Sequence, residues 1–105
     1  MILNALGLSA LVEAHDEREV DAALRAGARI IGVNNRNLKD FSVNPLNSLR
    51  LREQIPAEKL FVAESGIAKA SDCAGLKAAG VQAVLVGEAL MRSPNPAAMI
   101  KEMRA

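Results

Sequence analysis

The stretch LVEAHDEREVDAALRAGARIIGVN, residues 11–34, decides the fold class of this chain. It begins within a short apolar run, Ser9–Ala14, that is long enough for one buried strand. Asp16 follows, and Glu19 comes three residues later, which is the spacing of a capping box and predicts the start of a helix. An Ala-Gly pair is typical of the end of that helix, and the aliphatic run Arg29–Val33 predicts a second strand.

A second stretch, residues 61–88, repeats this order: FVAESG…GLKAAGVQAVLVGE echoes LVEAHD…ALRAGARIIGVN. Each copy has a strand with a carboxylate near its end, then a helix that ends in Ala-Gly, then an aliphatic strand. The carboxylate precedes the closing glycine by 14 residues in the first copy (Glu13 to Gly27) and by 16 in the second (Glu64 to Gly80). A repeated strand–helix unit predicts parallel strands joined by right-handed crossovers.

The rest of the chain supplies further strand and helix signals. They predict a helix from Pro45 that stops before Pro56, a strand over Lys59–Ala63, a helix from Ser71 or Asp72 to Gly80, a strand over Gln82–Val86, a short turn at Ala89–Met91 and a last helix over Ala97–Met103. Four strands with their helices are half of the eight that close a TIM barrel. The sequence therefore predicts an α/β fold, a single (βα)4 half-barrel over residues 1–105, in which residues 1–7 are the tail of a preceding helix.

Composition excludes several classes of protein. With 105 residues, 50% hydrophobic and 24% charged, the chain is neither disordered nor collagen-like. A net charge of +1 argues against nucleic acid as a partner, and no apolar run is long enough to span a membrane. Phe41 and Phe61 are the only aromatic residues, so the expected core is aliphatic. The single cysteine, Cys73, forms no intramolecular disulfide, which predicts a cytoplasmic protein.

The carboxyl ends of parallel strands carry the functional sites of such folds. This rule selects two carboxylates and an amide as candidate catalytic residues, Glu13, Asn34 and Glu64, because carboxylates act as general bases when their pKa is tuned. The pairs Ser65-Gly66 and Gly87-Glu88 predict a phosphate site, because glycine lets backbone N–H groups approach an anion. In the competing interpretation the acids only stabilise helix N-termini, and the glycines only form turns.

Other candidate residues carry weaker signals. His15 has no second His or Cys at ligand spacing, so we expect a solvated or helix-capping side chain and no metal site. Arg36 is a possible contact for a substrate anion, although a solvated loop arginine is equally consistent with its position. Packing roles are expected for Cys73 and for three methionines, Met91, Met99 and Met103.

Four segments in order, LVEAHD, IIGVNNRNL, FVAESGI and VLVGEALMR, resemble the indole-3-glycerol phosphate synthase family. That family consists of (βα)8-barrel lyases of tryptophan biosynthesis, and the resemblance covers strands five to eight, the C-terminal half of the barrel. It implies decarboxylating ring closure of an anionic sugar phosphate, 1-(2-carboxyphenylamino)-1-deoxyribulose 5-phosphate, with no metal or organic cofactor. The ESGI and GVNNRNL segments argue against a related barrel, phosphoribosylanthranilate isomerase.

The resemblance also implies roles for individual residues. Glu13 matches a strand-five general base, Asn34 a substrate-orienting asparagine, and Glu64 a glutamate near the reacting centre. The substrate- and phosphate-binding positions are matched by Ser65, Gly66, Gly87 and Glu88. Because the family often has Ser where this chain has Glu88, only the backbone N–H of Glu88 is expected to bind phosphate, with its side chain directed away.

The family's catalytic lysines lie on strands one and three, which this resemblance does not reach. Without them the 105 residues are expected to be inactive alone, since ring closure needs a proton donor. An open half-barrel has uncovered strand edges, which predicts a homo-oligomer or pairing with a complementing N-terminal half. The alternative is a non-catalytic module that binds phosphate or self-associates.

Overall fold

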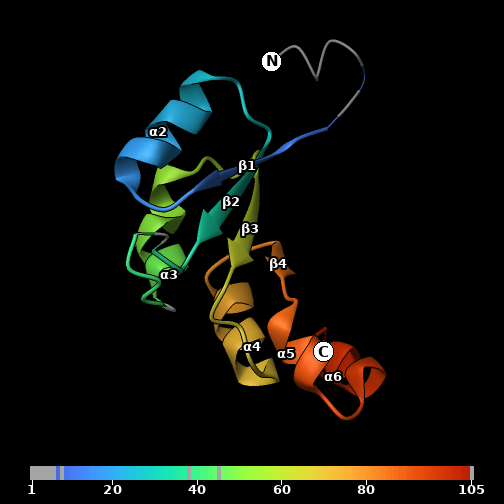
Figure 1. Ribbon diagram of the computed structural model, residues 1–105. Helices are drawn as coiled ribbons and strands as arrows, with labels where there is room; N and C mark the ends of the chain where they lie inside the picture. Colours follow the sequence, from blue (N-terminus) through green and yellow to red (C-terminus); the bar gives the residue numbers. More distant parts are fainter. Residues whose placement is uncertain (1–6, 8, 38, 45, 105) are drawn as a thin grey trace.

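The computed structural model describes residues 7, 9–37, 39–44 and 46–104, and its centre is a sheet of four parallel strands (Figure 1). The strands are β1 (Leu11–Ala14), β2 (Ile30–Asn34), β3 (Leu60–Glu64) and β4 (Ala83–Leu85), paired in the order β1-β2-β3-β4. The helical elements are α2 (Glu17–Arg25), α3 (Asn47–Leu51), the 3-10 turn η1 (Arg52–Gln54), α4 (Ala70–Ala78), α5 (Glu88–Arg92) and α6 (Pro96–Met103). Strands in sequential order with a helical crossover after each are the architecture of a partial TIM barrel, as the sequence predicts.

The two faces of the sheet differ in what covers them. Side chains alternate between the faces, and the register places every other residue of each strand on the same side. Figure 1 shows α2 and α3 on one side of the sheet. We call the opposite side the open face; it consists of Leu11, Glu13, Ile30, Gly32, Asn34, Leu60, Val62, Glu64, Ala83 and Leu85. Three of its leucines are between 44% and 54% exposed, namely Leu11, Leu60 and Leu85.

The helix-covered face forms the hydrophobic core. Its largest fully buried side chains are those of Phe61, Ile31, Leu51, Val20 and Val33. The core is therefore aliphatic apart from Phe61, whose ring lies 5.5 Å from the guanidinium carbon of Arg52, while Phe41 is 64% exposed. Among the described residues, no helix has the length and apolar character needed to cross a membrane.

Helix α2 begins where the capping-box spacing predicts. The Asp16 carboxylate accepts a hydrogen bond from the Glu19 N–H at 2.9 Å, which satisfies one of the free N–H groups of the first turn. The reciprocal bond goes to the preceding residue: Glu19 accepts from the N–H of His15 at 3.0 Å. The helix ends at Arg25, and Gly27 follows with a φ of +80°, a conformation that glycine adopts without strain.

The predicted boundaries differ from the structure at several places. The expected turn at Ala89–Met91 is part of a short helix, α5, and Met91 is 88% exposed, so its predicted packing role is wrong. Helix α4 begins at Ala70 and not at Ser71 or Asp72, because Asp72 accepts from the N–H groups of two residues that precede it in the chain. The expected N-terminal helix tail over residues 1–6 and the expected helix start at Pro45 lie outside the described residues.

Candidate functional site

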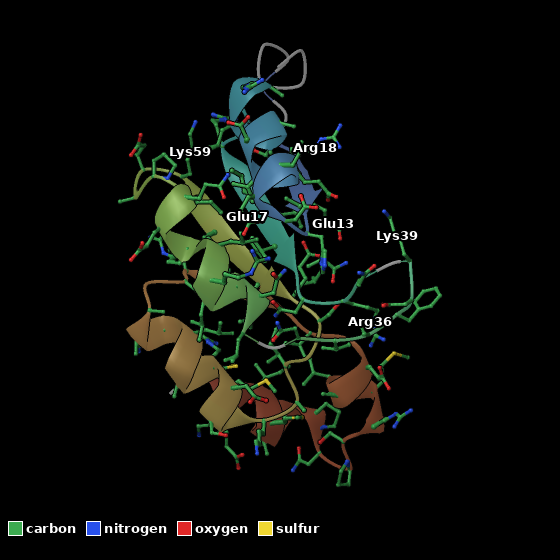
Figure 2. All side chains as sticks on the ribbon, turned by 90° about the vertical axis from the view of Figure 1, so that its left-hand side faces the viewer. Glu13, Glu17, Arg18, Arg36, Lys39 and Lys59 are labelled. Atoms are coloured by element: carbon green, nitrogen blue, oxygen red, sulfur yellow. The ribbon has the colours of Figure 1, made fainter. Side chains whose placement is uncertain are left out.

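Three candidate residues come together at the carboxyl ends of β1, β2 and β3. Glu13, Asn34 and Glu64 all lie on the open face, and the register pairs Asn34 directly with Glu64. In Figure 2, Arg36 and Lys39 lie on the segment that follows β2, at the far end of the sheet from Lys59. The parallel arrangement of the strands therefore brings together polar residues that are up to 51 positions apart in the sequence.

Asn34 connects the candidate residues through its side-chain amide. Its Oδ1 atom accepts two hydrogen bonds, one from the Ser65 hydroxyl and one from the Arg36 N–H, both at 2.9 Å. With the oxygen held in this way, the Nδ2 group faces β1 and donates to Glu13 Oε1 at 3.1 Å. The orientation of the amide is fixed by its donors, so Glu13 is held as a hydrogen-bond acceptor.

Glu64 is the buried carboxyl group of the site. Its side chain and backbone together are only 5% exposed, and its Oε2 atom has no hydrogen-bond partner among the described residues. Burial raises the pKa of Glu64 from 4.5 to about 7, and the negative charge of Glu13 together with a hydrogen bond to it acts in the same direction. A carboxyl group with a pKa near neutrality exchanges protons readily at physiological pH, as acid–base catalysis requires.

A layer of buried polar residues supports this arrangement from behind. Asn35 is 1% exposed, and its Oδ1 atom accepts from both the N–H and the hydroxyl of Ser48, each at 2.9 Å. Its Nδ2 group donates to the carbonyl of Ser65 at 3.0 Å, and so connects the loop after β3 to α3. No local signal in the sequence identifies this contact, because Asn35 and Ser65 are 30 residues apart.

His15, expected to be solvated or to cap a helix, is half-buried and belongs to the same supporting layer. Its Nδ1 atom lies 2.8 Å from the carbonyl oxygen of Asn34, so that Nδ1 is the protonated nitrogen. Asn47, which is 3% exposed, donates to the carbonyls of His15 and Asn34 at 2.7 and 3.1 Å. Within the described part of the chain, no three His, Cys, Asp or Glu side chains are grouped so that they could hold a metal ion.

A pocket of about 610 Å³ opens at the carboxyl ends of β3 and β4. Six of the eight candidate residues line it, namely Arg36, Glu64, Ser65, Gly66, Gly87 and Glu88. The other two, Glu13 and Asn34, lie outside the lining but are joined to it through the Asn34 amide. The pocket therefore combines backbone N–H groups at glycines, a buried carboxyl group and two cationic side chains, Arg36 and Arg92, which suits a polar, anionic ligand.

Backbone conformation at the rim of the pocket is unusual. Ser65 has a φ of +68° and Gly66 a φ of +73°, so two successive residues adopt the left-handed conformation. For a serine this conformation is strained, and such strain concentrates at functional sites. The strained turn directs the Ser65 hydroxyl to Asn34.

Three charged side chains that line the pocket are already engaged within the protein. The Glu88 carboxylate forms an exposed ion pair with Arg92 at 3.0 Å, one turn along α5. Sequence reasoning missed Arg92 as a pocket residue, because its place follows from the helix that replaces the expected turn. Arg36 donates to the carbonyl of Phe41 at 3.0 Å, which holds the guanidinium group beside its own loop.

Two solved structures resemble the fold. A crystal structure of the Amycolatopsis orientalis BexX/CysO complex aligns with a TM-score of 0.76 at 30% sequence identity, covering 98% of this chain and 43% of that one. A native KDPGal structure aligns with a TM-score of 0.71 at 18% identity, covering 96% of this chain and 48% of that one. In both cases the chain corresponds to less than half of a larger fold, which agrees with a partial barrel.

Comparison with sequence families points to a single group of enzymes. A family model for indole-3-glycerol phosphate synthase matches residues 3–103. The chain is 55% identical over 103 residues to the indole-3-glycerol phosphate synthase of Ruminiclostridium cellulolyticum, covering 98% of this chain and 40% of that protein. It is 56% identical over 97 residues to indole-3-glycerol phosphate synthase 2 of Streptomyces coelicolor, covering 92% and 38%. The chain thus spans about 40% of the length of these relatives. A match over nearly all of its residues means that this chain belongs to the indole-3-glycerol phosphate synthase family.

Proposed function

We propose that this chain forms the C-terminal half, strands five to eight, of an indole-3-glycerol phosphate synthase barrel. Together with an N-terminal half, it catalyses closure of the indole ring. The observation that carries the proposal is the pocket at the ends of β3 and β4, where six predicted site residues meet. The substrate is the anionic sugar phosphate that the family resemblance implies. A single free and buried Cys73 supports a cytoplasmic location.

In this proposal the carboxyl groups act on protons at the reacting centre. Glu13, held as an acceptor by the amide of Asn34, is the general base. Glu64 lies across the same face with a pKa raised by burial to about 7, so it is able to hold a proton near neutral pH. Asn34 orients the substrate and keeps the Glu13 carboxylate in place. Decarboxylation and ring closure are proposed to use side chains of this chain together with a proton donor of the N-terminal half, and no metal or cofactor is proposed.

The phosphate group is proposed to bind at the glycine-lined end of the pocket. Gly66 and Gly87 offer backbone N–H groups, and the Ser65 hydroxyl, which donates to Asn34 in the structure, lies beside them. At Glu88 only the backbone N–H contributes, since the carboxylate is paired with Arg92. Arg36 is a cationic contact for the phosphate, once its hydrogen bond to the Phe41 carbonyl is exchanged for the ligand.

The phosphate interpretation is tested by substitution of Gly87. A Cβ added at this glycine, which lines the pocket, meets nothing within 4 Å, so Gly87→Trp introduces a bulky side chain there without a clash at its first atom. Isothermal titration with ribulose 5-phosphate should show binding to the unaltered chain and at least a tenfold loss for Gly87→Trp. Gly75→Ala, also at an open position but away from the pocket, is the control. Equal affinity in all three proteins would contradict the phosphate site.

We propose that the isolated chain lacks turnover because it has no proton donor of the family's kind. All five of its lysines lie in the described part of the chain, and none of them is on a strand: Lys39, Lys59, Lys69, Lys77 and Lys101. Lys59 directly precedes β3, at the amino end of the sheet (Figure 2). The resemblance assigns the catalytic lysines to strands one and three of the complete barrel.

The test is reassembly. The purified chain, made in a host without its own enzyme, should show no indole-glycerol phosphate formation, whereas a mixture with the remaining part of the Ruminiclostridium relative should show it. Glu64→Gln should abolish activity of the mixture, and Asp21→Ala on the exposed side of α2 should leave it unchanged. Turnover by the chain alone, or an inactive mixture in which the two parts have bound each other, would overturn the proposal.

The exposed apolar surface supports a second proposal, that the open face is covered by another chain. Leu11, Leu60 and Leu85 are each about half exposed in a sheet whose other face is packed. Unpaired sheet edges and apolar patches of this kind favour association. In the absence of an N-terminal half, a second copy is the proposed occupant. Sedimentation should show a dimer that Leu60→Lys dissociates, whereas Met91→Lys, at an exposed apolar site elsewhere, does not. A monomer at high concentration would contradict this.

A further inference from the structure

We propose that Gly32 is a positioning residue of the site: the space left by its missing side chain is the recess in which the Glu64 carboxyl group lies beside Glu13. No site residue predicted from the sequence lies within β2 before its last position, and Gly32 has neither charge nor a polar side chain. Its contribution is therefore made through Glu64 and not through contact with a ligand.

The geometry of the recess is specific. A Cβ atom built on Gly32 would lie 1.9 Å from Glu64 Oε2, so the carboxyl group would have to move, and 3.1 Å from Glu64 Cδ, which is a tight contact. The third near atom, Leu11 Cδ1 at 3.1 Å, is the end of a flexible side chain and can turn away. The register pairs Gly32 with Glu13 on one side, so the recess places the Glu64 carboxyl group next to that residue.

Backbone conformation does not explain a glycine at this position. Gly32 is absent from the glycines with positive φ, and it lies inside a regular parallel strand with partners on both sides. Glycine in the interior of a strand is unfavourable because it loses more conformational freedom on folding than any other residue. A strand that carries it there, between isoleucine and valine, therefore uses it for space.

The recess determines which carboxyl group of the pair holds a proton. Glu13 accepts a hydrogen bond from the Asn34 amide, whereas the Oε2 atom of Glu64 is buried with no hydrogen-bond partner among the described residues. The titratable groups around Glu64 are Glu13 on β1, His15 behind Asn34, Arg36 across the pocket and the Glu88–Arg92 ion pair on α5. Of these groups, Glu13 is the one that interacts directly with Glu64 in the described part of the chain, and Leu85 on the neighbouring strand β4 is apolar. Removal of the recess should therefore separate the two acids and return Glu64 to ordinary behaviour.

The proposal rests on the proposed function only for the chemical role of Glu64, and the recess is tested without substrate. The side-chain carboxyl carbons of the 105-residue chain are followed by NMR between pH 3 and 9. The midpoint for Glu64 should be about 7 in the unaltered chain and should fall toward 4.5 in Gly32→Ala, because the displaced carboxyl group reaches solvent. Gly75→Ala, where nothing lies within 4 Å of the added methyl group, should leave the midpoint at about 7.

A double-mutant cycle keeps the test decisive if Gly32→Ala unfolds the chain. Glu64→Ala removes the atoms that the new methyl group would meet, so Gly32→Ala should be far less destabilising in the Glu64→Ala background than in the unaltered chain. A midpoint that stays near 7 in folded Gly32→Ala would overturn the proposal. The proposal would also be overturned if the losses in the free energy of unfolding of the two single variants simply added up in the double variant. Loss of activity in the reassembly assay with an intact recess would instead contradict the proposed function alone.

Discussion

The two copies of the strand–helix–strand unit, residues 11–34 and 61–88, differ most in the environment of their carboxylates. Glu13 is exposed on β1, at the edge of the sheet, whereas Glu64 is buried on β3, in its interior. Five residues after the closing glycine, the first copy has Gly32 and the second has Leu85, and each is paired in the sheet with the glutamate of its own copy. The glycine recess thus lies on β2, between Glu13 and Glu64, and the neighbouring strand on the other side of Glu64, β4, has no such recess at the paired position.

This difference shows that a repeated pattern does not give a repeated chemical environment. The second strand of the first copy, β2, has neighbours on both sides, and Ile31 and Val33 on it are fully buried. The second strand of the second copy, β4, is an edge, and its residues are partly buried or exposed. Position in the sheet therefore contributes to the difference between an exposed carboxylate and a buried one.

The largest expected difference between the copies is in the core. Ile31 and Val84 each lie four residues after the glycine that closes the helix of their copy. Ile31→Ala should lower the free energy of unfolding by about 2–5 kcal/mol, because it leaves a cavity in a fully buried site. Val84→Ala, on the partly buried edge, should cost about 1 kcal/mol. Urea denaturation of both variants measures the difference, and equal costs would refute the contrast between centre and edge.

The buried acid of the second copy should make stability depend on pH. Since the pKa of Glu64 is about 7 in the folded chain and near 4.5 when unfolded, the folded state binds more protons between these values. The stability that the protonated Glu64 contributes is complete below pH 4.5 and is lost as the pH rises through 7. The free energy of unfolding should fall by about 3 kcal/mol over this range. Glu64→Gln stays neutral and should be the more stable protein at pH 8.

The control for this prediction is Glu102→Gln, at an exposed position on α6. The free energy of unfolding of this variant, measured by denaturation at pH 5 and at pH 8, should fall between the two pH values as it does in the unaltered chain. A Glu64→Gln variant with the same loss between the two pH values would show that another group is responsible.

The smallest expected effects concern the starts of the two helices. In the first copy Asp16 precedes α2 and accepts from the N–H of Glu19, and in the second Asp72 lies within α4 and accepts from the N–H groups of Ala68 and Lys69. Because both satisfy free N–H groups at a helix start, Asp16→Ala and Asp72→Ala should each cost about 1 kcal/mol. Asp21→Ala, which removes only an exposed ion pair with Arg25, should cost roughly 0.5 kcal/mol or less. Thermal unfolding compares the three, and a cost at Asp21 as large as at the caps would contradict the capping explanation.

Sequence alone determined the class of fold, the identity of the strands and the end of the sheet where the candidate residues lie. Apolar periodicity and the Ala-Gly signals are local, so they predict β1 to β4 and α2 to within a few residues. Parallel strands then bring their carboxyl ends together without any knowledge of packing. The sequence predicts only a short turn over Ala89–Met91, because so few residues carry little periodic pattern, whereas α5 extends over Glu88–Arg92, and Arg92, which it adds to the pocket, was missed.

Only the tertiary structure decided how the site residues differ from one another. It decided the burial of Glu64, the orientation of the Asn34 amide and the hydrogen bonds of Asn35 and His15. These hydrogen bonds join residues between 13 and 31 positions apart in the sequence. Such contacts leave no mark in a local pattern, because they depend on which strands are neighbours and which side chains leave room. Two glutamates with the same sequence signal therefore became a solvated acceptor and a buried acid, and a glycine without any functional group of its own separates the two outcomes.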